Sequence, residues 1–105
     1  MKLYIRSAAK HYPVKLPDGS YTKFADGGNI TKIKTILGAG TDKELRASIL
    51  LEATYNVPRK YWSKCRGEGK VYIEHKVHRV ELHWYEAQGK RYRMKVKWDF
   101  EEGDD

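Results

Sequence analysis

Side chains that can move protons and hold phosphate alternate with apolar residues in two runs near the C-terminal end, residues 80–86 and 91–98. They are Glu81, His83, Tyr85, Arg91, Arg93, Lys95 and Lys97. An imidazole gives or takes a proton near neutral pH, which typically speeds a reaction by ~100- to 10,000-fold. Arginine and lysine stabilise the negative charge that develops on phosphorus. Cleavage of RNA by its own 2′-hydroxyl needs such groups, with His83 and Glu81 as the proton carriers.

The two-residue period of both runs indicates two β-strands, each with an apolar and a charged face. The predicted apolar face carries Val80, Leu82, Trp84, Tyr92, Met94, Val96 and Trp98. The loop 87–89 ends in a glycine, where a three-residue hairpin needs a left-handed residue, so we expect the strands to be antiparallel neighbours. This pairing places His83 beside Arg93 or, with a shift of two residues, beside Lys95.

An ordinary solvated sheet face would produce the same alternation. A cross-strand pair of opposite charges is common on protein surfaces and contributes only about 0.2–1 kcal/mol. The charged face is therefore either a phosphate-handling site, in which Tyr85, Arg93, Lys95 and Lys97 contact nucleic acid, or a surface without a ligand.

A second candidate anion site precedes the predicted main helix, residues 42–55. Gly38, Gly40 and Thr41 belong to a glycine-rich turn, and Thr41 with Glu44 matches the capping box, which satisfies free N–H groups at a helix start. Such N–H groups and the helix dipole attract anions. The alternative is a plain strand-to-helix turn, because Gly-x-Gly lacks the spacing of a nucleotide-binding loop.

The predicted helix has a buried stripe of Leu45, Ile49 and Ala53 with Leu50 and Leu51 flanking, and it ends at Asn56 before Pro58. After it we expect a short helical turn that carries Tyr61 and Trp62 toward the core. Cations follow in the same segment: Arg59, Lys60, Lys64 and Arg66. Lys64 and Arg66 are candidates for contact with a nucleic-acid backbone, and the aromatic rings are either stacking surfaces or, for Trp62 above all, core.

The remaining elements are strands. Residues 12–24 predict a hairpin around Pro17-Asp18-Gly19, and residues 3–5 predict a short edge strand. Residues 30–37 and 70–74 predict two more strands, with a turn at residues 75–78 that leaves His75 and His78 in solvent. The fold class is thus α+β: an antiparallel sheet ends in a C-terminal three-stranded meander, the helix packs on one face, and the other face stays free.

Length and composition set the frame for these elements. A chain of 105 residues suits one domain, residues 1–100, followed by an acidic disordered tail, residues 101–105. The single cysteine, Cys65, excludes an intramolecular disulfide and has no metal-ligand spacing, which favours a reducing compartment and predicts no metal or other cofactor. No apolar run suits a membrane span or a signal peptide, so we expect a cytoplasmic protein without a membrane partner.

The charge is unevenly distributed. The formal net charge is +7, but five of the 14 acidic residues lie in the last seven positions, so residues 1–98 hold 21 basic and nine acidic side chains, a balance of +12. Such a field attracts polyanions, RNA or DNA, or an acidic protein. A charge that serves only solubility is the alternative.

Four short motifs, in order, resemble a domain found at the C-terminus of phage minor head (head-morphogenesis) proteins, as stand-alone proteins of mobile elements and in polymorphic toxins. They are IKTILGAGT (33–41), WSKCRGEG (62–69), ELHWYE (81–86) and MKVK (94–97). The resemblance covers residues 24–100. It implies membership of the barnase, EndoU, colicin and RelE group of metal-independent ribonucleases, with RNA as partner and, in a toxin, an acidic immunity or regulatory protein.

On that resemblance, His83 stands at the position of a general acid or base, and Arg93, Lys95 and Lys97 hold the phosphate. Ala39 departs from the pattern, which commonly carries a lysine between the two glycines, so this copy is either weakened or inactive if that lysine contributes. Two hypotheses remain: an RNA-directed domain with ribonuclease activity, and a non-catalytic nucleic-acid-binding or protein-interaction module of a phage-derived element.

Overall fold

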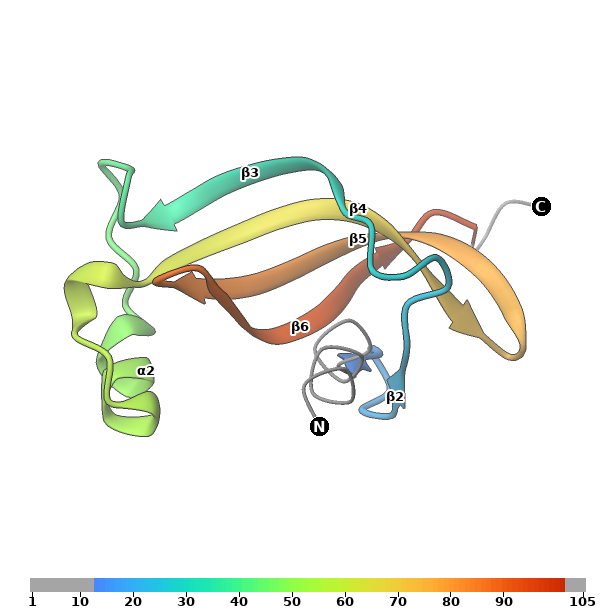
Figure 1. The fold of residues 1–105 in the computed structure, drawn as a ribbon, viewed down its shortest axis with the longest axis horizontal. Coiled ribbons are helices and arrows are strands. Elements are labelled where there is room, and N and C mark those ends of the chain that lie inside the picture. Colours follow the sequence, from blue (N-terminus) through green and yellow to red (C-terminus); the bar gives the residue numbers. More distant parts are fainter. Residues whose placement is uncertain (1–12, 102–105) are drawn as a thin grey trace, which may run out of the picture.

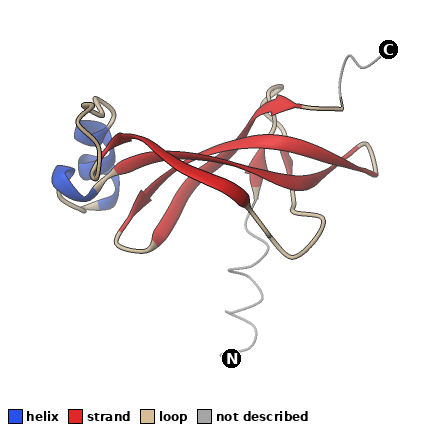
Figure 2. Cartoon of the chain, turned by 90° about the horizontal axis from the view of Figure 1, so that it is seen from above, coloured by secondary structure: helices blue, strands red, loops and turns tan. Residues whose placement is uncertain are grey.

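The computed structural model describes residues 13–101 and has an α+β fold, with one α-helix and one six-stranded mixed sheet among those residues (Figures 1 and 2). The strands are β1 (Val14–Lys15), β2 (Tyr21–Thr22), β3 (Thr31–Gly38), β4 (Ser63–Ile73), β5 (Lys76–Ala87) and β6 (Lys90–Asp99). The helix is α2 (Ser48–Tyr55), and a 3₁₀ turn, η1 (Arg59–Tyr61), follows it. The strand order is β2-β1-β6-β5-β4-β3.

Strands β4, β5 and β6 are antiparallel neighbours, as the alternating runs predicted, but they are longer than expected. Strand β4 begins at Ser63 instead of residue 70. It turns into β5 at Glu74 and His75, both with positive φ, so the predicted turn at 75–78 is confirmed only for the exposed His75, and residues 76–78 belong to β5. The β5–β6 loop has two residues, Gln88 and Gly89, rather than three, and both again have positive φ, as the tight hairpin turn that matches strand twist requires.

The N-terminal hairpin is confirmed, because β1 and β2 pair antiparallel with Lys15 opposite Tyr21. Strand β1 then pairs parallel with β6 through Lys15 and Lys95, which makes the sheet mixed and not purely antiparallel. The edge strand predicted at residues 3–5 lies outside the described residues, and so does all of the predicted acidic tail except Glu101.

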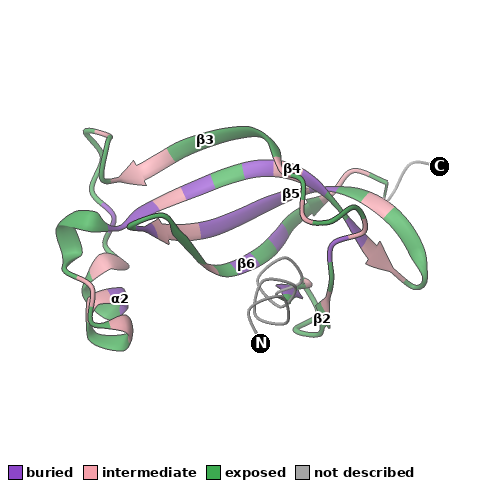
Figure 3. Ribbon diagram, viewed as in Figure 1, coloured by how far each residue is buried: buried purple, intermediate pink, exposed green. Residues whose placement is uncertain are grey.

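The core lies between the sheet and the segment 13–30, which crosses one of its faces (Figures 1 and 3). Its buried members are Val14, Phe24, Cys65, Val71, Val80, Leu82, Trp84, Met94 and Val96. Gly67 and Gly69 lie inside β4, not before the strand as predicted. A Cβ atom on Gly67 would lie 2.6 Å from Cγ2 of Ile30, so the absent side chain lets the crossing segment pack directly on the strand.

The helix differs most from its prediction. It begins at Ser48, six residues after the predicted start, and it packs at one end of the sheet instead of on its face (Figure 1). Of the predicted stripe, Leu45 and Leu51 are buried, whereas Ile49 is 59% exposed and Leu50 and Ala53 are exposed too, so the stripe is confirmed only in part. The end at Asn56 is confirmed by its left-handed conformation. No helix in residues 13–101 has the length and apolarity needed to cross a membrane.

Candidate functional site

Strand register brings cationic side chains from four strands into one row with His83 of β5. Lys34 of β3 pairs with Arg66 of β4, Arg66 pairs with His83 of β5, His83 pairs with Lys95 of β6, and Lys95 pairs with Lys15 of β1. Directly paired residues share a face of a sheet. The row is therefore one face, which we call the basic face, and the second of the two predicted registers, His83 beside Lys95, is confirmed.

His83 is held by Glu81 on this face. Nε2 of His83 lies 2.8 Å from Oε2 of Glu81, so Nε2 carries the proton of that hydrogen bond, because a carboxylate only accepts. The His83 side chain is only 11% exposed, and its Nδ1 is buried without a hydrogen-bond partner. Nδ1 of the imidazole is thus free of hydrogen bonds, and the cross-strand neighbours of His83 are the cations Arg66 and Lys95.

Lys64 adds a crowded positive charge to the row. Removal from water lowers the pKa of Lys64 below its usual 10.5, and the charges of Lys95 and Lys97 lower it further. Lys97 is exposed on β6, two residues from Lys95, and it extends the basic face. The three lysines are held together by the sheet and not by any favourable contact among themselves, and an anion between them would relieve the strain.

Two irregularities of β6 redirect its side chains. Pairing with β5 shifts between Glu81 and Leu82 and again between His83 and Tyr85, and Arg93 has a φ of 55°. A bulge adds one residue and reverses the faces beyond it. Trp98 consequently pairs with Glu81 and is 61% exposed, so its predicted place in the core is wrong.

Tyr92 is redirected in the same way. It pairs with Tyr85 and not with a core residue of β5. Its ring lies 4.6 Å from that of Tyr55 and 4.8 Å from that of Trp62, in a second apolar cluster beneath the helix. The alternation of residues 91–98 predicted a single apolar face. The bulges instead leave Met94 and Val96 in the main core and place Tyr92 in the second cluster.

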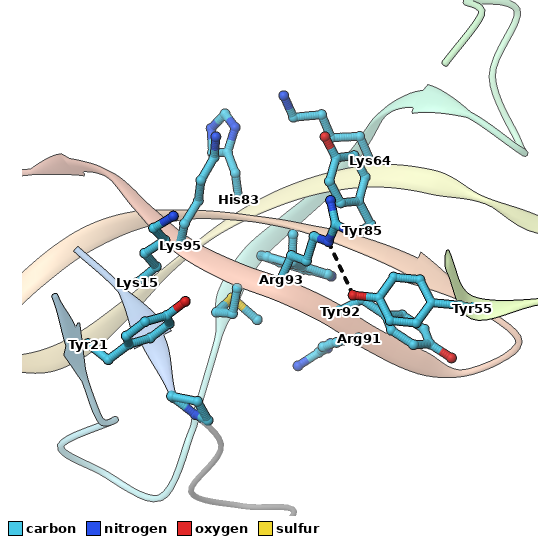
Figure 4. A pocket seen from close by; sticks show the side chains of 13 residues that line it. Lys15, Tyr21, Tyr55, Lys64, His83, Tyr85, Arg91, Tyr92, Arg93 and Lys95 are labelled. Atoms are coloured by element: carbon cyan, nitrogen blue, oxygen red, sulfur yellow. Dashed lines mark hydrogen bonds between the residues drawn. The ribbon is translucent and has the colours of Figure 1, made fainter. Parts of the chain in front are cut away.

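A groove of about 740 Å³ runs beside β6 between the N-terminal hairpin and the helix (Figure 4). Five consecutive β6 residues, 91–95, line it, as expected along the free edge of a strand that β1 covers only at Lys95. Figure 4 shows Tyr21 at one end and Tyr55 at the other, with Arg93 between them. Nε of Arg93 donates to the hydroxyl of Tyr55 at 3.1 Å, which holds the guanidinium over the groove.

Eight predicted site residues lie on the basic face or in the adjoining groove. They are Lys64, Arg66, Glu81, His83, Tyr85, Arg93, Lys95 and Lys97. Gly38, Gly40 and Thr41 do not join them. Thr41 forms a local turn in which its hydroxyl donates to the carbonyl of Gly38 and accepts from the N–H of Lys43, and Ala47 precedes the helix without a side-chain cap. The predicted capping box is wrong. The turn at residues 38–41 therefore does not form the helix N-terminus on which the predicted anion site depended.

Four residues of the site were not predicted: Lys15, Tyr21, Lys34 and Tyr55. They come from separate elements, and only the strand order places them next to His83. No spacing within the sequence signals such a juxtaposition, although Lys15 and Tyr21 stand opposite each other in the predicted hairpin.

No protein-family model, curated protein or solved structure matches the chain. The resemblance to the phage head-morphogenesis domain therefore stays a prediction. Within residues 13–101, no group of three or more His, Cys, Asp or Glu side chains is arranged to hold a metal ion.

Proposed function

We propose that the basic face binds a nucleic-acid backbone, and RNA in particular. The observation that carries the proposal is the row of cations that crosses five strands through His83. A protein that neutralises phosphates with Lys and Arg releases condensed counterions, which supplies most of the affinity of backbone binding.

The cations of the face are available for such a ligand. Within the described part of the chain, no ion pair engages Lys15, Lys34, Lys64, Arg66, Lys95 or Lys97. The nearby carboxylates are committed elsewhere: Glu68 pairs with Lys32 and Arg79, and Glu81 pairs with His83. Charges that serve only solubility are usually interspersed with opposite charges, whereas the row Lys34, Arg66, His83, Lys95 and Lys15 contains no carboxylate.

Fluorescence anisotropy with a labelled RNA at several salt concentrations tests the proposal. We expect the combined variant Lys64→Gln, Arg66→Gln and Lys95→Gln to weaken binding and to reduce the slope of log K against log salt by about 2, since each lost contact contributes ~0.7 for a single strand. The matched control replaces Lys43, Lys60 and Lys76, which lie off the face, with glutamine. Equal losses in both triple variants, or no RNA binding by the unmodified protein, would overturn the proposal.

A second function, metal-independent ribonuclease activity, is favoured by the Glu81–His83 pair itself. In that mechanism His83 exchanges the proton of the 2′-hydroxyl or of the leaving oxygen, Glu81 is the other proton carrier, and Lys95 with Arg66 stabilises the charge on phosphorus. Because the His83 side chain is only 11% exposed, RNA reaches the imidazole only after a neighbouring side chain moves.

Incubation of the protein with labelled RNA in EDTA separates these functions. Cleavage by the unmodified protein and not by His83→Ala supports the enzyme. Salt-sensitive binding without cleavage supports the non-catalytic binding module. If the protein neither binds nor cleaves RNA, a protein-interaction or structural role is the hypothesis that remains.

A further inference from the structure

The two most exposed large aromatic side chains of residues 13–101 flank the basic face. Tyr21 is 64% exposed and Trp98 is 61% exposed. Tyr21 pairs with Lys15 of the cationic row, and Trp98 pairs with Glu81, two residues from His83 on the same strand. Both rings thus stand beside the cations and not at a distant part of the surface.

The exposure of Trp98 is built into the strand. The shift in β5–β6 pairing at Lys97 turns this side chain away from the core that Val80, Leu82 and Val96 form. The other two tryptophans, Trp62 and Trp84, are each 1% exposed. Exposure of a large apolar ring to water raises the free energy of the folded protein unless a ligand covers the ring.

We propose that Trp98 and Tyr21 are stacking platforms for unpaired bases, so that the basic face selects single-stranded over duplex nucleic acid. This inference rests on the proposed backbone binding and adds the class of strand to it. Aromatic side chains beside a cationic track bind single strands irrespective of sequence, because every base has a π-face. A duplex hides those faces in its own stack.

The spacing suits this arrangement. Tyr21 lies two strands from Lys95, about 10 Å at ~4.8 Å per strand, and Trp98 lies three residues along β6 from Lys95, about 10 Å at ~3.3 Å per residue. The lysines at the centre can hold phosphates while bases reach outward to either ring. Tyr21 also borders the groove along β6, which offers room for a base beside the ring (Figure 4).

An acidic protein segment is the competing occupant of the same surface, since it too would satisfy the cations. The surroundings of Trp98 favour a base. Its neighbours in sequence and register are Lys97, Asp99 and Glu81, so the ring stands alone and is not part of the contiguous apolar patch that marks a protein-docking surface.

Tryptophan fluorescence tests the inference directly, because Trp98 is the exposed member of the three tryptophans and dominates quenching by acrylamide. We expect oligouridylate to quench the emission and to protect it from acrylamide, whereas inorganic polyphosphate, which has charge but no bases, leaves Trp98 accessible. Trp98→Phe, which removes the reporter and keeps a ring, should lose the signal and retain binding. Protection by polyglutamate equal to that by oligouridylate would overturn base stacking in favour of a protein partner.

Affinity provides the second measurement. Trp98→Ala and Tyr21→Ala should each weaken binding of single-stranded RNA by about 5- to 100-fold, and they should leave polyphosphate binding and the melting temperature unchanged. Tyr61→Ala is the matched control, since Tyr61 is 41% exposed but belongs to η1 at the helix end. RNA binding with no effect of either substitution overturns the platforms and leaves backbone binding intact, whereas absence of binding to both RNA and polyphosphate overturns the proposed function itself.

Discussion

Two histidines of β5, five residues apart, each contact a carboxylate, and their surroundings differ. Nε2 of His83 lies 2.8 Å from Glu81, and Nδ1 of His78 lies 2.9 Å from Asp99. His83 has Arg66 and Lys95 as its cross-strand neighbours, whereas His78 stands opposite Val71. The same pair of groups is thus embedded in a cationic face at one position and beside the apolar core at the other.

The comparison teaches that a histidine–carboxylate contact does not define a site by itself. His78 was predicted to be a solvent-exposed turn residue, but it lies within β5, and its partner Asp99 has a side chain that is only 8% exposed. Asp99 also accepts a hydrogen bond from the N–H of Glu101, so this pair ties the end of β6 to β5. We therefore assign a structural role to His78–Asp99 and reserve the chemical role for His83–Glu81.

The largest expected difference between the two pairs is in RNA cleavage. If the domain is a ribonuclease, His83→Ala should lower the rate by ~100-fold or more, because general acid–base catalysis is lost. His78→Ala should retain the rate within a factor of two or so of the unmodified protein. Single-turnover cleavage of a labelled RNA in EDTA measures both, and equal losses would remove the distinction between the pairs.

For the stability of the fold we expect the His78–Asp99 pair to contribute more than the His83–Glu81 pair. Asp99→Ala removes two hydrogen bonds from a nearly buried carboxylate and should lower the free energy of unfolding by about 1.5–3 kcal/mol. Glu81→Ala removes one hydrogen bond from a carboxylate that is 20% exposed, so we expect a loss nearer 1 kcal/mol. Urea denaturation followed by circular dichroism checks the ranking. A larger loss for Glu81→Ala would mean that the His83 pair, too, is chiefly structural.

Charge reversal on the basic face and charge reversal at the start of β5 should have different effects on RNA binding. Lys95→Glu puts a carboxylate between the lysines of the basic face and should weaken RNA binding by about 1 kcal/mol, roughly five-fold, and make it less sensitive to salt. Lys76→Glu, at the start of β5, makes the same change in net charge away from the face. Anisotropy titrations that give equal losses would indicate a response to net charge alone.

The smallest expected effect concerns Lys64. Desolvation, together with the charges of Lys95 and Lys97, lowers the pKa of Lys64 in the folded protein below 10.5. Between that lowered pKa and 10.5 the unfolded chain therefore binds more protons than the folded protein does. The free energy of unfolding should rise with pH across this window. Lys64→Gln should therefore stabilise the protein at pH 7 by up to about 0.5 kcal/mol while it weakens RNA binding.

Urea denaturation at pH 7 and near pH 10 measures this coupling. In Lys64→Gln the rise of stability toward pH 10 should be smaller than in the unmodified protein. A destabilised variant at pH 7 would show that Lys64 is held by favourable contacts, and the idea of a charge strain awaiting an anion would then be abandoned.

Local signals in the sequence determined the elements and the faces near His83. Alternation with period two predicted residues 80–86 of β5 and the faces of residues 93–97 of β6. It placed Glu81, His83, Tyr85 and Lys95 on one face, because neighbouring side chains of a strand must point to opposite sides. Turn chemistry at Pro17-Asp18-Gly19 predicted the β1–β2 hairpin. The left-handed tendency of Asn56, with Pro58 beyond it, predicted where the helix ends.

The tertiary structure alone decided the rest of the site. The bulges of β6 expose Trp98, since a one-residue shift in pairing carries no mark in the sequence and is settled by packing against β5. The parallel contact of β1 with β6 brings Lys15 and Tyr21 to the basic face, and the packing of the helix end against Trp62 and Tyr92 brings Tyr55 to the groove. Such placements depend on contacts between residues far apart in the chain, whereas the alternation that marks His83 depends only on its neighbours.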